Sequence, residues 1–139
     1  MITVQISVQG TLAKGLAPDI AREALHNTVQ SLIETGDETL ALMARPRPAG
    51  VYKSYAEGGT STGNYRRNMH SEVRNLAGFI TDSGVIYGPW LEGVGSRNAT
   101  TRFKGYSMFR RTAQHLGAMA YEVAEQQVAR MVRRLNGVT

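Results

Sequence analysis

Residues 84–111 read GVIYGPWLEGVGSRNATTRFKGYSMFRR, and the rest of the chain is organised around this stretch. A short apolar run at residues 85–87 predicts a β-strand, which ends at a Gly-Pro step. The only Trp follows, and a loop rich in Gly, Ser and Asn then reaches Phe103. We call residues 93–106 the docking loop. A strand, an aromatic knuckle around Trp90 and a polar loop before a helix are typical of a surface that docks a partner.

Two long helices are predicted from apolar residues that recur every three or four positions. The first runs from Pro18 to about residue 44, where an Arg-Pro repeat ends it. Gly36 lies inside this helix and predicts either a bend or a close packing contact. The second helix begins after Ser107, a suitable N-cap, and continues to about residue 135, where Asn136-Gly137 predicts its end.

The strands are predicted from alternation and from turn residues. Residues 2–9 alternate between apolar and polar side chains, which predicts a half-buried strand, and residues 10–15 predict a turn. Two antiparallel strands are predicted near residues 69–74 and 76–81, joined at Asn75, and residues 82–84 predict a turn into a fourth strand at 85–87. The predicted fold class is α+β, a mostly antiparallel sheet of about four strands with two long amphipathic helices packed on one face.

The length of 139 residues fits a single domain, residues 1–139. Residues 45–63 contain two Pro and four Gly without a sustained period, which predicts a flexible loop. Tyr52 and Tyr55 lie in this loop, either in an arm that becomes ordered against a neighbour or in a disordered segment. No apolar run is long enough to cross a membrane, and the first residues do not read as a signal peptide.

The residues that usually carry chemistry are scarce or scattered. The chain has no Cys, which excludes disulfides, thiolate metal sites and Cys nucleophiles. Its three His lie far apart without the spacing of a metal site, and there is no Gly-x-Ser-x-Gly motif. We therefore expect no enzymatic activity, no metal and no cofactor.

The net charge is +5, from 16 Lys and Arg against 11 Asp and Glu. Most of the cations are Arg, which suits interfaces because its planar guanidinium pairs with carboxylates and phosphates. Two aromatic-Arg-Arg runs, at residues 65–67 and 109–111, fit nucleic-acid binding through phosphate contacts and stacking. A core aromatic flanked by surface Arg explains the same pattern. A small basic nucleic-acid-binding module is therefore the alternative function.

Two segments resemble motifs of a known family. Residues 61–69, STGNYRRNM, are similar to that family's S/T-G-x-L-R-x-S-I entry into a strand. Residues 87–95, YGPWLEGVG, are similar to its Y-A-x-x-x-E-x-G knuckle, and a Gly-rich loop then leads to an aromatic residue and Arg before the last helix. The chain thus resembles the small neck and tail-completion proteins, of the gene-10 type, of long-tailed bacteriophages.

The resemblance implies a structural virion protein of the head–tail junction or tail top, assembled in the host cytoplasm. Such proteins form homo-oligomeric rings, usually hexamers, as tail terminators or neck proteins. They join the head connector and head-closure proteins to the tail tube, and DNA passes through the axial channel without sequence-specific binding. The residues expected at subunit or ring interfaces are Tyr52, Tyr55, Tyr87, Trp90, Glu92, Arg102, Phe103, Arg110 and Arg111. Glu92 is expected to pair with Arg102, Arg110 or Arg111 of the next subunit.

Overall fold

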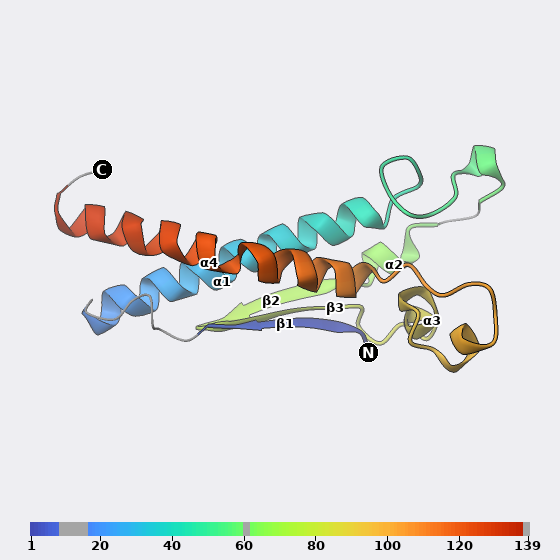
Figure 1. Cartoon of the computed structure of the whole chain (residues 1–139), viewed down its shortest axis with the longest axis horizontal. Coiled ribbons are helices and arrows are strands. Elements are labelled where there is room, and N and C mark those ends of the chain that lie inside the picture. Colours follow the sequence, from blue (N-terminus) through green and yellow to red (C-terminus); the bar gives the residue numbers. More distant parts are fainter. Residues whose placement is uncertain (9–16, 60–61, 138–139) are drawn as a thin grey trace.

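The computed structural model describes residues 1–8, 17–59 and 62–137 as a small sheet covered on one face by helices (Figure 1). The strands are β1 (Thr3–Ser7), β2 (His70–Arg74) and β3 (Ala77–Thr81), in the antiparallel order β1-β3-β2. The long helices α1 (Pro18–Met43) and α4 (Met108–Leu135) pack against each other and against the sheet. The α+β class with an antiparallel sheet is confirmed, but three strands stand where four were predicted.

The remaining elements are short and lie near one end of the molecule, where α1 finishes and α4 begins (Figure 1). They are the 3₁₀ helix η1 (Tyr55–Glu57), the helices α2 (Asn64–Arg67) and α3 (Gly88–Glu92), and the 3₁₀ helix η2 (Ser96–Ala99). This end also contains most of the residues that the sequence singles out for docking.

The alternation at the start of the chain forms β1 as predicted. Val4 lies under the helices and is 5% exposed, whereas its neighbours Thr3 and Gln5 are exposed on the open face of the sheet. Val4 pairs with Ile80 of β3, and Ile80 is fully buried. The turn predicted for residues 10–15 lies outside the described residues.

The β2–β3 hairpin forms at Asn75 as predicted, with a positive φ of 54° that suits a tight two-residue turn. The fourth strand, predicted at residues 85–87, is wrong. Asp82 accepts the Gly84 N–H at 3.0 Å, and Gly88 donates to the Val85 carbonyl at 2.9 Å. These turns consume the backbone groups that a strand would need, and the apolar run leads directly into α3.

Close packing, rather than a bend, explains Gly36. A Cβ at this position would lie 2.7 Å from Ile80 Cδ1 and 2.9 Å from Leu116 Cδ1, so α1 can approach both β3 and α4. Gly78 does the same from the sheet, because a Cβ there would lie 2.7 Å from Ile33 Cγ1. The two glycines bring α1 down onto the sheet and keep the helix continuous through Gly36.

The described part of the 45–63 loop is held by local hydrogen bonds. Arg47 N donates to the Tyr52 carbonyl at 2.8 Å, and Gly59 N donates to the Ser54 carbonyl at 2.8 Å. Glu57 caps η1, and the Ser54 backbone N–H that it accepts lowers the pKa of its carboxyl. These contacts order the segment locally, and the bond from Val51 N to the Met43 carbonyl at 3.0 Å joins it to the end of α1.

Candidate functional site

Aromatic rings from three separate segments form one cluster at the α3 end of the molecule. The ring centroids of Tyr52 and Tyr106 lie 5.2 Å apart, those of Tyr106 and Phe103 5.0 Å, and those of Phe103 and Trp90 4.9 Å. Such edge-on and tilted contacts each contribute about 0.5–1.5 kcal/mol beyond burial. The cluster therefore fixes the 45–59 loop, α3 and the docking loop relative to one another.

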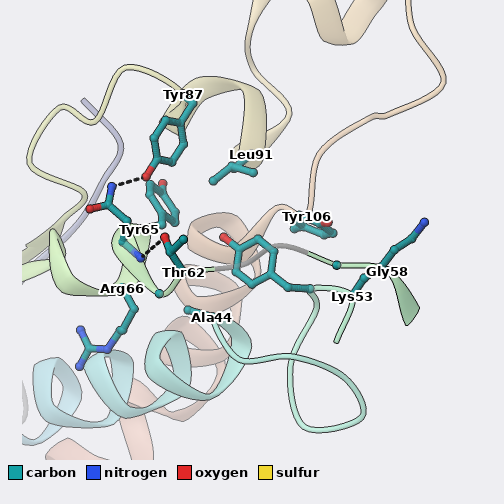
Figure 2. Close-up of a pocket in the computed structure, with 13 residues that line it drawn as sticks. Ala44, Lys53, Gly58, Thr62, Tyr65, Arg66, Tyr87, Leu91 and Tyr106 are labelled. Carbon is teal, nitrogen blue, oxygen red and sulfur yellow. Dashed lines mark hydrogen bonds between the residues drawn. The ribbon is translucent and has the colours of Figure 1, made fainter. Parts of the chain in front are cut away.

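A cavity of about 510 Å³ opens between this cluster and α2. Four tyrosines line it together with Ala44 and Leu91: Tyr52, Tyr65, Tyr87 and Tyr106. Figure 2 shows Tyr65, Tyr87, Leu91 and Tyr106 around the opening, whereas Arg66 points away toward α1. Arg66 pairs there with Asp37 at 3.2 Å, so its charge is directed away from the cavity.

Two of the cavity tyrosines are held in their neutral form. Burial raises the pKa of Tyr52 above its ordinary value of 10.0, and its hydroxyl has no hydrogen-bond partner among the described residues. Burial, followed by the negative charge of Asp82, raises the pKa of Tyr65. Tyr65 donates to Asp82 Oδ2 at 3.1 Å, so its polar group is satisfied where that of Tyr52 is not.

Asp82 organises the base of the site. It is fully buried, and its Oδ1 accepts the backbone N–H groups of Ile2 and Gly84, each at 3.0 Å. A Cβ on Gly88 would collide with its Oδ2, so only glycine lets the start of α3 approach this carboxylate. Asp82 thus joins the beginning of β1, the end of β3, α2 and α3 around one side chain.

The docking loop is a closed loop with a narrow stem. Tyr106 N donates to the Leu91 carbonyl at 2.6 Å across the stem. Gly93 and Gly105 face each other beside this bond, both with positive φ, and a Cβ on either would collide with the opposite backbone. Loops of this kind, with adjoining ends and internal packing, are compact units rather than extended linkers.

Asn98 holds the interior of the docking loop and is 3% exposed. Its Oδ1 accepts the Gly95 N–H at 2.9 Å, and its Nδ2 donates to the Trp90 and Phe103 carbonyls at 3.1 Å each. Lys104 Nζ donates to the Asn98 carbonyl at 2.7 Å. Because the amide uses both its donor and its acceptor inside the loop, the loop is ordered without a partner.

Glu92 has an internal role that differs from its predicted one. It is 7% exposed, and its two carboxylate oxygens accept the backbone N–H groups of Phe109 and Arg110, each at 2.9 Å. It therefore caps the positive end of α4. Both oxygens serve this cap in a nearly buried side chain, and the pair with an Arg of the next subunit stays a prediction.

Ser107 occupies the N-cap position of α4, but its side chain makes no capping bond. Its φ of 52° lies in the left-handed region, and its hydroxyl donates to the Glu92 carbonyl at 3.4 Å instead. The start of the helix was thus predicted correctly and the capping group was not. A carboxylate fifteen residues upstream replaces the local hydroxyl.

The cations of this end are exposed. Arg97, Arg102, Lys104, Arg110 and Arg111, which we call the basic surface, all lie in or directly after the docking loop. No carboxylate of the described residues is within ion-pair distance of any of them. The four ion pairs in the described part of the chain involve other arginines, at positions 47, 66, 74 and 134.

The predicted interface residues thus divide into three groups. Tyr52, Trp90 and Phe103 meet in the aromatic cluster, and Tyr87 lies across the cavity, 37% exposed. Arg102, Arg110 and Arg111 are exposed, and Tyr55 on η1 is 74% exposed. Sequence reasoning missed Tyr106 and Asn98; the position of Tyr106 directly after Gly105 was the only local signal.

The described residues show neither a metal-binding cluster nor a membrane-spanning helix. The described part of the chain contains no group of three or more His, Asp or Glu that could hold a metal ion. None of its helices is long and apolar enough to cross a membrane. No family model, curated protein or solved structure matched the chain.

Proposed function

We propose that this chain is a structural subunit of a ring at the head–tail junction or tail top of a long-tailed bacteriophage. In this role the ring joins the head connector to the tail tube around a channel for DNA. The motif resemblance of residues 61–69 and 87–95 motivates the proposal. The observation that carries it is the arrangement of the two sheet edges.

β1 and β2 form opposite edges of the three-stranded sheet. The two-residue turn makes Arg74 and Ala77 a hydrogen-bonded pair, and such pairs alternate along the ladder. The N–H and C=O groups of Ser71 and Val73 consequently point outward from β2. On β1, the Ile2 carbonyl accepts the Asp82 N–H, so the backbone groups of Ile2 point toward β3. Because the direction alternates along a strand, the N–H and C=O groups of Thr3, Gln5 and Ser7 point outward from β1.

Two unlike free edges favour head-to-tail addition, in which β1 of one subunit pairs with β2 of the next. Repeated around a rotation axis, this contact closes into a ring and leaves no subunit with an unpaired edge. A groove of about 310 Å³ lies beside β2, between Ser71–Val73 and the α1 residues His26, Gln30, Ile33 and Glu34. This groove offers room for side chains of an added strand.

The test measures the mass of the purified protein by light scattering, for the wild type and for Gln5→Pro. Pro at position 5 removes an outward N–H and leaves the β1–β3 hydrogen bonds intact, so it should block the edge without unfolding the sheet. The control is Gln5→Ala, which keeps that N–H. We expect a discrete oligomer for the wild type and Gln5→Ala and a monomer for Gln5→Pro. A wild type that stays monomeric at high concentration and in assembled particles would contradict the proposal.

The alternative, a nucleic-acid-binding module, is favoured by the basic surface but not by the two aromatic-Arg-Arg runs. Tyr65 and Phe109 are 4% and 2% exposed, so neither ring is free to stack on a base. Arg66 pairs with Asp37, and Arg67 donates to the Thr62 carbonyl at 2.9 Å. Tight duplex binding that weakens steeply with salt and is lost in the Arg66→Ala, Arg67→Ala double variant would favour this alternative.

A further inference from the structure

The positive charge of the chain is segregated in one segment. Residues 93–121 contain all five cations of the basic surface and no Asp or Glu. The rest of the chain contains eleven Lys and Arg and eleven Asp and Glu, so the whole net charge of +5 comes from this segment. The nearest acid before it, Glu92, is buried against the start of α4 and so adds no exposed negative charge.

The basic surface is built on an ordered support. Asn98 and the Gly93–Gly105 stem fix the docking loop that carries Arg97, Arg102 and Lys104. Arg110 and Arg111 lie in the first turn of α4, whose backbone is held by Glu92. A partner that binds here meets charges already positioned by the backbone, which lowers the entropy lost on association.

Exposed aliphatic side chains next to α3 and in the docking loop indicate which kind of polyanion fits. Ile86 and Val94, on either side of α3, are 94% and 69% exposed. Aliphatic side chains contribute to a protein interface, whereas phosphate groups offer them no contact. Of the aromatic rings in or beside the docking loop, Trp90, Phe103 and Tyr106 pack on one another and are not free to stack on bases. This combination of exposed aliphatic groups and cations matches an acidic protein surface with apolar spots.

We infer that the basic surface, together with Ile86 and Val94, docks the acidic and partly apolar surface of another protein. In the proposed ring, this partner is the protein that adjoins the ring along the tail axis. The inference therefore rests on the proposed function only for where the partner lies. The chemistry of the contact rests on the charge segregation, the ordered loop and the exposed aliphatic side chains alone.

The experiment measures binding by fluorescence anisotropy with three labelled probes. They are a peptide of alternating Glu and Leu, a poly-glutamate peptide of equal charge, and a DNA duplex. The docking variant replaces Arg97, Arg102, Arg110 and Arg111 by Gln. The matched control makes the same change at Arg22, Arg45, Arg130 and Arg133, which are exposed and lack an ion pair among the described residues.

We expect the wild type to bind the Glu-Leu peptide most tightly. The docking variant should weaken this binding about tenfold or more, and the control less than about twofold, because four modest ion pairs are lost only in the docking variant. Val94→Ser should weaken binding of the Glu-Leu peptide and leave poly-glutamate binding unchanged.

Three outcomes would overturn the inference: equal losses in the two quadruple variants, equal affinity for the two peptides, or tightest binding of the duplex. The mass of each variant is measured in parallel. A wild type that stays monomeric but binds the Glu-Leu peptide contradicts the ring alone, and an oligomeric wild type that does not bind the Glu-Leu peptide contradicts the docking surface alone.

Discussion

Asn98 connects three parts of the docking loop through one amide group, and it does so in a nearly buried position. Asn98→Ala removes all three bonds: the Gly95 N–H keeps the Pro89 carbonyl at 3.1 Å and the Phe103 carbonyl keeps the Thr101 hydroxyl at 3.3 Å, whereas the Trp90 carbonyl loses the Asn98 donor. We expect the free energy of unfolding to fall by about 1–3 kcal/mol, the usual range for buried groups left unsatisfied. Urea denaturation measures this loss, and hydrogen exchange at the Gly95 amide reports opening of the loop itself.

Thr100→Ala is the control for this prediction, because Thr100 lies in the same loop but is exposed and donates only a long 3.4 Å bond to the Arg97 carbonyl. Its free energy of unfolding should stay within about 0.5 kcal/mol of the wild type. If the two variants are equally stable, the docking loop is not held by Asn98.

Tyr52 and Tyr65 form a contrasting pair at the same cavity. Tyr65→Phe removes the bond to buried Asp82 and should cost about 1–2 kcal/mol, whereas Tyr52→Phe removes a hydroxyl that has no partner among the described residues and should be nearly neutral at pH 7. Denaturation of both variants at pH 7 tests the contrast. A large loss in Tyr52→Phe would show that its hydroxyl has a partner in solution.

The same two tyrosines predict instability in alkali. Both pKa values are raised on folding, so the stabilisation is complete below the ordinary pKa of 10.0 and is lost as the pH rises from there toward the folded pKa. We expect the free energy of unfolding of the wild type to fall above pH 10. Tyr52→Phe should show a smaller fall, which denaturation over a pH series detects.

At the scale of elements, replacing Gly by Ala should change the stability of the protein in opposite directions at Gly36 and Gly117. Ala is the better helix former by about 1 kcal/mol at both positions. Gly117 on α4 is exposed with nothing within 4 Å of a Cβ, so Gly117→Ala should stabilise the protein. Gly36→Ala must displace the ends of Ile80 and Leu116, which are 0% and 2% exposed and lie in the packed core.

We therefore expect Gly36→Ala to be destabilising by about 1 kcal/mol or more, since overpacking outweighs helix propensity in a filled core. Thermal unfolding of the two variants and of the wild type tests the pair. A stabilising Gly36→Ala would mean that α1 can move away from β3 without loss of packing.

The long helices were predictable because their periodicity persists over many turns, and both were placed within a residue or two of their observed ends. The fourth strand was not, because three apolar residues carry little pattern and their conformation depends on the turn that buried Asp82 organises just before them. The docking loop was recognised from composition as a surface feature. Its internal order was not, since no periodicity reveals the three hydrogen bonds of Asn98.

The candidate site was also predictable only in part from the sequence. Exposed arginines and aromatic anchors were predicted from residue type, and the structure brings Tyr52, Trp90 and Phe103 together through Tyr106. Glu92 was assigned to an intersubunit pair because a lone acid among arginines favours that reading. Its distance in sequence from the α4 N-terminus concealed its role as a cap.

At the scale of the whole molecule, the two sheet edges allow a complementation experiment. Gln5→Pro blocks β1 and Ser71→Pro blocks β2, because each removes an outward N–H from an edge strand. Alone, neither variant can add head to tail. Mixed in equal amounts, the free β2 of the first can pair with the free β1 of the second, and light scattering should detect a heterodimer but no larger species.

Other pairings predict different masses. If two copies of β1 pair with each other, Ser71→Pro alone will dimerise; if two copies of β2 pair, Gln5→Pro alone will dimerise. Either result would replace the head-to-tail contact by a two-fold one. A mixture that remains monomeric would mean that the edges do not carry association.

The basic surface lies at one end of the long axis, and the strands run along that axis (Figure 1). β1 and β2 are parallel to each other because both are antiparallel to β3. Subunits added side by side through these edges would all point the same way. The assembly would then have two unlike rims, of which one would carry the basic surface of every subunit. The two faces of such a ring would differ, and the electrostatic field of the positively charged rim would orient the ring toward an acidic partner before the two surfaces touch.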